Sequence, residues 1–108
     1  LQELYGEGVN RPTAIISVND MMALGCMDEA RAVLELKVPD DLSVAGFDGT
    51  GVSQFASYEL TTIRQPIGRM SQAAVNMIAA RVETPDQSNE KRVFEGALIE
   101  GGSIAKAP

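Results

Sequence analysis

The chain has 108 residues, of which 44% are hydrophobic and 22% charged, a balance typical of one small globular domain. The formal net charge is −6, and the nine Lys and Arg residues are scattered, which argues against a surface that neutralises nucleic-acid phosphates. The single cysteine, Cys26, excludes an intrachain disulfide and fits a reducing cytoplasm, and no apolar run is long enough to cross a membrane.

The absence of histidine removes the commonest general base and the commonest metal ligand. No glycine-rich phosphate loop and no Gly-x-Ser-x-Gly nucleophile motif follows a predicted strand. We therefore expect a protein that is not an enzyme and that has no metal and no cofactor.

Two short apolar runs, residues 14–18 and 42–48, have the length and the flanking turn residues of buried strands. Between them, residues 20–36 carry a helical pattern, which Asn19 or Asp20 is expected to cap. The apolar face of this helix is made by four residues: Ala23, Met27, Ala30 and Leu34. The order strand, helix, strand predicts a right-handed crossover and a parallel pair.

The second half of the chain continues the alternation. A single helical turn is predicted at residues 52–55, a third strand at 60–65, a helix from Pro66 to about Val82, and a terminal strand at 92–100. The second helix is expected to bury a face made of Ile67, Ser71, Ala74, Ile78 and Val82. Together these elements predict an α/β fold with three layers, in which helices flank a mainly parallel sheet.

A polar residue follows each of the three predicted strands: Asn19, Asp48 and Gln65. Parallel strands end at the same edge of a sheet, where open α/β folds bind their ligands, so we expect these side chains to converge. Two amides and a carboxylate suit a ligand with several hydroxyl or amide groups. The alternative is that Asn19 and Gln65 only cap helices and that Asp48 only starts a turn.

Four segments resemble, in the same order and with similar spacing, the effector domain of lactose-repressor (LacI/GalR) family regulators. They are residues 12–25 (PTAIISVNDMMALG), 38–48 (VPDDLSVAGFD), 60–66 (LTTIRQP) and 98–103 (LIEGGS). The resemblance implies a transcription regulator with a helix-turn-helix headpiece and a periplasmic-binding-protein-like core of two lobes around a ligand cleft. Residues 1–108 would then be a single partial domain, most of the C-terminal lobe, without the N-terminal lobe and the headpiece.

The resemblance also implies site residues and partners. Ligand contacts carry over to Asn19, Asp48 and Gln65. Contacts in a homodimer carry over to Leu24 and Asp28 of the first helix and to Phe55 and Ala56 of the loop. The implied partners are a sugar or related polyol as effector, and operator DNA bound only through the headpiece, in the cytoplasm and without a membrane. The alternatives are a periplasmic solute-binding protein of an uptake system and an oligomerisation module without a ligand site.

Overall fold

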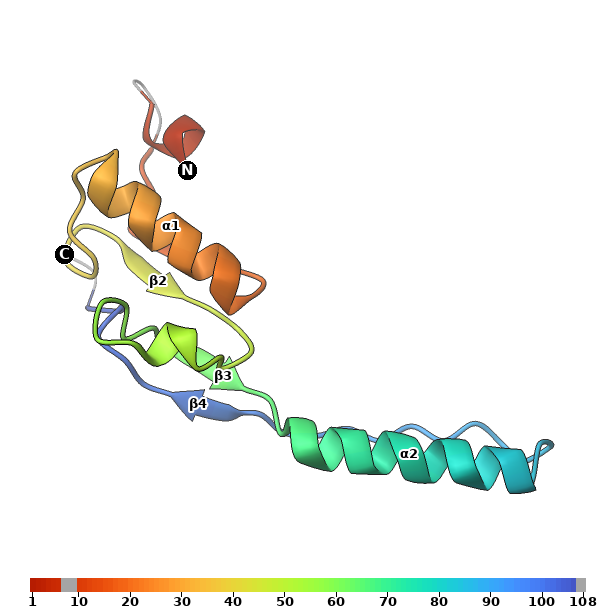
Figure 1. Ribbon diagram of the computed structural model, residues 1–108. Helices are drawn as coiled ribbons and strands as arrows, with labels where there is room; N and C mark the ends of the chain where they lie inside the picture. The colour runs from red at the N-terminus through yellow and green to blue at the C-terminus, as the bar shows by residue number, and fades with distance from the viewer. Residues whose placement is uncertain (7–9, 107–108) are drawn as a thin grey trace. The chain divides into compact units, whose positions relative to one another are not determined.

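The computed structural model describes residues 1–6 and 10–106, which form two compact units (Figure 1). Unit 1 comprises Leu1–Arg64 and Leu98–Pro108, and unit 2 comprises Gln65–Ala97. The segment Gln65–Ala97 packs mainly on itself, and the single partial domain predicted for residues 1–108 stays a prediction. Among the described residues, no helix has both the length and the apolarity that crossing a bilayer would require.

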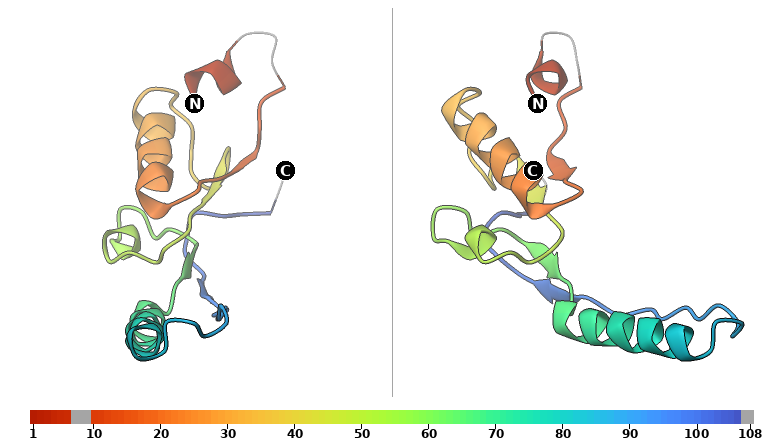
Figure 2. Two further views of the ribbon diagram at one scale, coloured as in Figure 1. Left: turned by 90° about the vertical axis from the view of Figure 1, so that its right-hand side faces the viewer. Right: turned by 45° about the vertical axis from the view of Figure 1, so that its right-hand side comes forward.

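Unit 1 contains the predicted strand–helix–strand motif. Strand β1 (Ala14–Ile16) runs parallel to β2 (Ser43–Ala45), with Ile15 opposite Val44. Helix α1 (Asp20–Ala32) connects them and lies alongside β2 in each view (Figures 1 and 2). The short 3-10 helices η1 (Gln2–Tyr5) and η2 (Val52–Gln54) complete the helical structure of this unit, and η2 confirms the predicted single turn.

Strand β3 (Thr62–Arg64) extends the parallel arrangement. Isolated parallel bridges join Ala45 to Thr61 and Asp48 to Arg64, so β2 and β3 run in the same direction. Strand β4 (Ala97–Ile99) pairs with β3 and lies beside it in Figures 1 and 2. The terminal strand is shorter than the predicted 92–100, since residues 92–96 and residue 100 lie outside the strand.

One face of α1 supplies the core of unit 1. Side chains from α1 pack on the strand side chains, and the fully buried members are Ala23, Met27, Ala30, Leu42, Val44 and Leu60. Burying a side chain as large as Met27 or Leu42 stabilises the fold by about 1.5–3 kcal/mol. Because side chains alternate along a strand, Val44 points into this core while Ile16, 84% exposed, lies on the opposite face of the sheet.

Helix α1 ends four residues earlier than predicted. The backbone N–H groups of Val33 and Leu34 both donate to the carbonyl oxygen of Glu29, and Glu35 adopts a positive φ of 54°. This closing turn takes Leu34 off the helix, so its side chain is only half-buried.

Unit 2 consists of helix α2 (Ile67–Glu83) and the segment that returns beside it (Figure 1). Of the residues of α2, all of which are described, only Ala73 is buried. The predicted apolar face is wrong, since Ile67, Ile78 and Val82 are 58%, 65% and 75% exposed.

The returning segment of unit 2 contacts α2 through two arginines. The guanidinium of Arg81 donates to the carbonyl oxygens of Pro85 and Gln87, and the guanidinium of Arg69 lies 5.6 Å from the ring centroid of Phe94. The returning segment thus contacts α2 through Arg69 and Arg81, while Ile67, Ile78 and Val82 remain more than half exposed.

Candidate functional site

Asn19 stands between β1 and α1 and caps the helix. Its backbone is extended, with φ −150° and ψ 167°, and its side-chain oxygen accepts from the backbone N–H of Met22 at 2.8 Å. This bond satisfies one of the free donors of the first helical turn. The capping function predicted for Asn19 is therefore confirmed. The cap fixes its side chain at the carboxyl end of β1.

Asp48 follows β2 in an unusual backbone conformation. Its φ of 131° is rare for a residue with a side chain, and such conformations cost about 1–3 kcal/mol. The surroundings hold it there, because its backbone N–H donates to the carbonyl oxygen of Ile63 at 2.9 Å. The following Gly49 has φ 72°, and a Cβ at this position would lie 2.6 Å from Cβ of Arg64. The close approach of β3 therefore requires glycine at position 49.

Asp20 is a functional candidate that the sequence reasoning treated only as a possible cap. Its side chain is fully buried and accepts three hydrogen bonds. Oδ1 accepts from the hydroxyl of Thr62 at 2.5 Å, and Oδ2 accepts from the backbone N–H and the hydroxyl of Thr50 at 2.7 and 3.0 Å. The spacing of these residues in the sequence gives no periodic signal, since they lie 30 and 42 positions from Asp20.

The charge of Asp20 is stabilised by these donors. Burial alone would raise the pKa of its carboxyl group. The hydrogen bonds from Thr62 and Thr50 outweigh burial and hold the pKa below its usual value, so Asp20 is ionised at neutral pH.

Gln65 is the residue directly after β3 and the first residue of unit 2. It is half-buried, and its carbonyl oxygen accepts from the backbone N–H of Ile67 at 2.9 Å. Asn19 and Asp48 both belong to unit 1, at the carboxyl ends of neighbouring parallel strands. The joint site of Asn19, Asp48 and Gln65 stays a prediction.

The residues predicted for a dimer contact differ in their exposure. Leu24 is 4% exposed and belongs to the core of unit 1, so it offers little surface to a partner. Asp28, Phe55 and Ala56 are exposed. The hydroxyl of Tyr58 donates to the carboxylate of Asp28 at 3.2 Å, which links α1 to the loop that carries Phe55 and Ala56.

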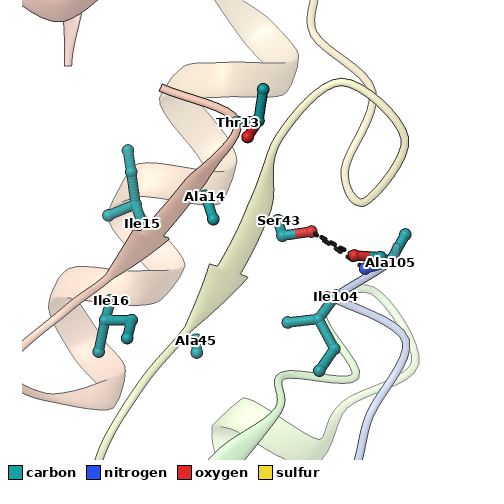
Figure 3. Close-up of a pocket in the computed structure, with 8 residues that line it drawn as sticks. All are labelled: Thr13, Ala14, Ile15, Ile16, Ser43, Ala45, Ile104 and Ala105. Atoms are coloured by element: carbon teal, nitrogen blue, oxygen red, sulfur yellow. Dashed lines mark hydrogen bonds between the residues drawn. The ribbon is translucent and has the colours of Figure 1, made fainter. Parts of the chain in front are cut away.

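Two depressions lie on the strands of unit 1. The larger, of about 500 Å³, is mainly apolar and follows the carboxyl half of the strands, with Val18, Phe47, Thr62 and Ile63 among its lining residues. The smaller, of about 280 Å³, lies against β1 and β2 beside Ile104 and Ala105 (Figure 3). There the backbone N–H of Ala105 donates to the hydroxyl of Ser43 at 3.0 Å. None of the predicted ligand residues Asn19, Asp48 and Gln65 lines either depression.

Parallel strands joined through a helix, with polar side chains after their carboxyl ends, define a class of α/β ligand-binding domain. The sequence profile of the periplasmic binding protein-like domain matches residues 1–104. The chain belongs to this family, in the form that LacI-type transcription regulators carry.

Known proteins resemble the chain over most of its length. The HTH-type transcriptional repressor PurR of Vibrio campbellii is 45% identical over 85 residues, which are 79% of this chain and 25% of that protein. A LacI-type regulator from Bifidobacterium animalis subsp. lactis is 34% identical with a TM-score of 0.83, over 97% of this chain and 37% of the other. A LacI family regulator from Lactobacillus casei with bound sucrose is 30% identical with a TM-score of 0.72, over 87% of this chain and 34% of the other. The chain thus spans about a quarter of the repressor and about a third of the regulators of known structure.

Proposed function

We propose that the chain is the effector-binding and dimerising part of a DNA-binding transcription regulator, and that its effector is a sugar or a related polyol. The observation that carries the proposal is the placement of Asn19 and Asp48 after neighbouring parallel strands, in a chain of this family. The sucrose bound to the Lactobacillus casei regulator supports the ligand class.

The proposed contacts follow from the chemistry of the side chains. The carboxylate of Asp48 accepts hydrogen bonds from sugar hydroxyls, and the amide groups of Asn19 and Gln65 both donate and accept. Such polar groups fix the orientation of a ligand whose remaining surface meets apolar side chains. The apolar depression along the carboxyl half of the strands, which includes Phe47 and Val18, supplies surface of that kind in unit 1.

The regulatory step in this proposal is a coupling between distant sites. Effector binding draws the two lobes of the core together, and this rigid-body change alters the spacing of the two DNA-binding headpieces in a homodimer. Operator DNA is bound by the headpiece alone, which agrees with the net charge of −6 of this chain. The regulator works on DNA in the cytoplasm, and the regulator names of the relatives favour this function over solute uptake.

Titration of the ¹⁵N-labelled chain with sucrose, followed by NMR, tests the proposal. We expect chemical-shift changes at the amides of Asn19 and of residues 48–50, with a Kd of about 1 mM, which corresponds to roughly 4 kcal/mol. Asn19→Asp keeps the oxygen that caps α1 and removes the amide donor, and Asp48→Asn removes the charge. Both are expected to weaken binding.

The matched control is Asp40→Asn, which removes an exposed carboxylate before the amino end of β2. It is expected to leave the titration unchanged. Sucrose shifts that avoid residues 19 and 48–50, or that all three variants reduce alike, would contradict the proposed site.

A further inference from the structure

We propose that Asp20 is a positioning residue for ligand recognition: it holds both ends of the turn at residues 47–50 and thereby orients Asp48. The proposal rests on the proposed function, because it takes Asp48 as a ligand contact. It concerns a residue that makes no ligand contact of its own, since its side chain is fully buried.

The hydrogen bonds of Asp20 bracket Asp48. Before the turn, the backbone N–H of Asp20 donates to the carbonyl oxygen of Phe47 at 2.9 Å. After it, the backbone N–H of Thr50 donates to Oδ2 of Asp20 at 2.7 Å. The residues between these two anchor points are Asp48 and Gly49, and both have positive φ. A strained turn persists only where its neighbours fix it, and Asp20 supplies an anchor on each side.

The groups around Asp20 suit a carboxylate, which accepts hydrogen bonds through both of its oxygens. Oδ2 faces two donors of Thr50 and Oδ1 faces the hydroxyl of Thr62, so an asparagine could accept on one of these sides only. A Cβ on Gly46 would lie 2.7 Å from Oδ1 of Asp20. Glycine at position 46 therefore leaves the space that the carboxylate occupies between α1 and β3.

Two threonines provide a matched pair of variants. Thr50→Val and Thr62→Val each remove one hydroxyl that donates to Asp20, with little change of shape. Thr50 belongs to the turn of Asp48, whereas Thr62 is in β3. If Asp20 only stabilised the fold, Thr50→Val and Thr62→Val would affect Asp48 alike. If Asp20 positions Asp48, only Thr50→Val should change the φ of Asp48.

The experiment is NMR on the full 108-residue chain. The three-bond coupling between the amide and α protons of Asp48 reports its φ, and hydrogen exchange reports the opening of the Thr50 amide. We expect Thr50→Val to change the coupling of Asp48. It should also speed hydrogen exchange of the backbone amide of residue 50 about five- to tenfold relative to the slowest amides. We expect Thr62→Val to leave both unchanged, and Asp20→Asn to give the largest change.

Titration of the same variants with sucrose connects the geometry with recognition. Thr50→Val is expected to weaken sucrose binding about fivefold or more, and the control Asp40→Asn, at an exposed position, to keep it. An Asp48 coupling that stays at its original value in both Thr50→Val and Asp20→Asn would overturn the proposal, as would equal changes in the two threonine variants. Absence of sucrose shifts in the unaltered chain would instead count against the proposed function, while the coupling of Asp48 still tests the positioning by Asp20.

Discussion

The hydroxyl of Ser103 donates a hydrogen bond to the carbonyl oxygen of Val44 at 2.6 Å. The same oxygen of Ser103 accepts from the backbone N–H of Thr61 at 2.8 Å, and the N–H of Val44 donates to the carbonyl oxygen of Ser103 at 2.8 Å. The C-terminal segment is thus bonded to both β2 and the start of the β3 segment, through a serine that is fully buried. One hydroxyl satisfies two buried backbone groups.

Ser103→Ala is therefore expected to leave the N–H of Thr61 and one lone pair of the Val44 carbonyl without this partner. An unsatisfied buried group costs about 1–3 kcal/mol, so the free energy of unfolding should fall by roughly that amount. Urea denaturation followed by circular dichroism measures it. Ser57→Ala, at an exposed position, is the control. Equal unfolding free energies for the Ser103 variant and the parent chain would contradict the assignment.

Gly101→Ala is expected to destabilise unit 1 by about 1–3 kcal/mol or more, because overpacking forces the backbone to move. A Cβ on Gly101 would lie 1.9 Å from the carbonyl oxygen of Glu59. Gly51→Ala is the matched control, since nothing lies within 4 Å of its Cβ position, and its backbone has φ −60° and ψ −37°. It is expected to be neutral or to stabilise the chain by about 0.4–1 kcal/mol. Thermal unfolding of both variants tests this prediction. Equal stability of the Gly101→Ala and Gly51→Ala chains would contradict it.

Acid stability is expected to depend on Asp20. Hydrogen bonds hold its folded-state pKa below the unfolded value, so its ionised form stabilises the fold above the unfolded pKa of about 3.9. That stabilisation is lost as the pH falls through the lower folded-state pKa. Asp20→Asn should therefore be less stable than the parent at neutral pH and lose less stability from about pH 5 to about pH 2. Urea midpoints across this range test the prediction, with exposed Asp40→Asn as control. Parallel pH profiles for the Asp20 variant and the parent would refute it.

The dimer surface is expected to include Phe55, whose side chain is 59% exposed beside Ala56. Large aromatic residues often dominate the binding energy of an interface, so Phe55→Ser should raise the dimer dissociation constant about tenfold or more. Sedimentation equilibrium of the 108-residue chain measures the constant. Val93→Ser, at an 80% exposed residue of unit 2, should leave it unchanged. A chain that stays monomeric at every concentration, or equal effects of the two variants, would count against this surface.

Several parts of the molecule could be predicted from local patterns. The apolar runs gave β1 and β2 and their parallel pairing, and the helical spacing of Ala23, Met27 and Ala30 gave the buried face of α1. The N-cap at Asn19 followed from the preference of short polar side chains for free helical N–H groups. These features depend on neighbours close in sequence, which is why the sequence alone reveals them.

Which residues of α2 are buried could not be predicted in the same way. Its apolar residues Ile67, Ile78 and Val82 have helical spacing, yet they are exposed, while Arg69 and Arg81 lie against the returning segment. Periodicity shows that a helix has two faces, and the position of the next segment decides which of them is covered.

The sequence by itself indicated the family, through the resemblance of four segments. It also determined the order of the strands along the chain and the polar residues that follow them, because strand length, helix period and capping are local properties. Only the tertiary structure revealed the division into two units and the buried carboxylate of Asp20 beneath the turn of Asp48. Thr50 and Thr62 meet Asp20 across 30 and 42 positions. Such a contact depends on how the strands are brought together, which no local pattern encodes.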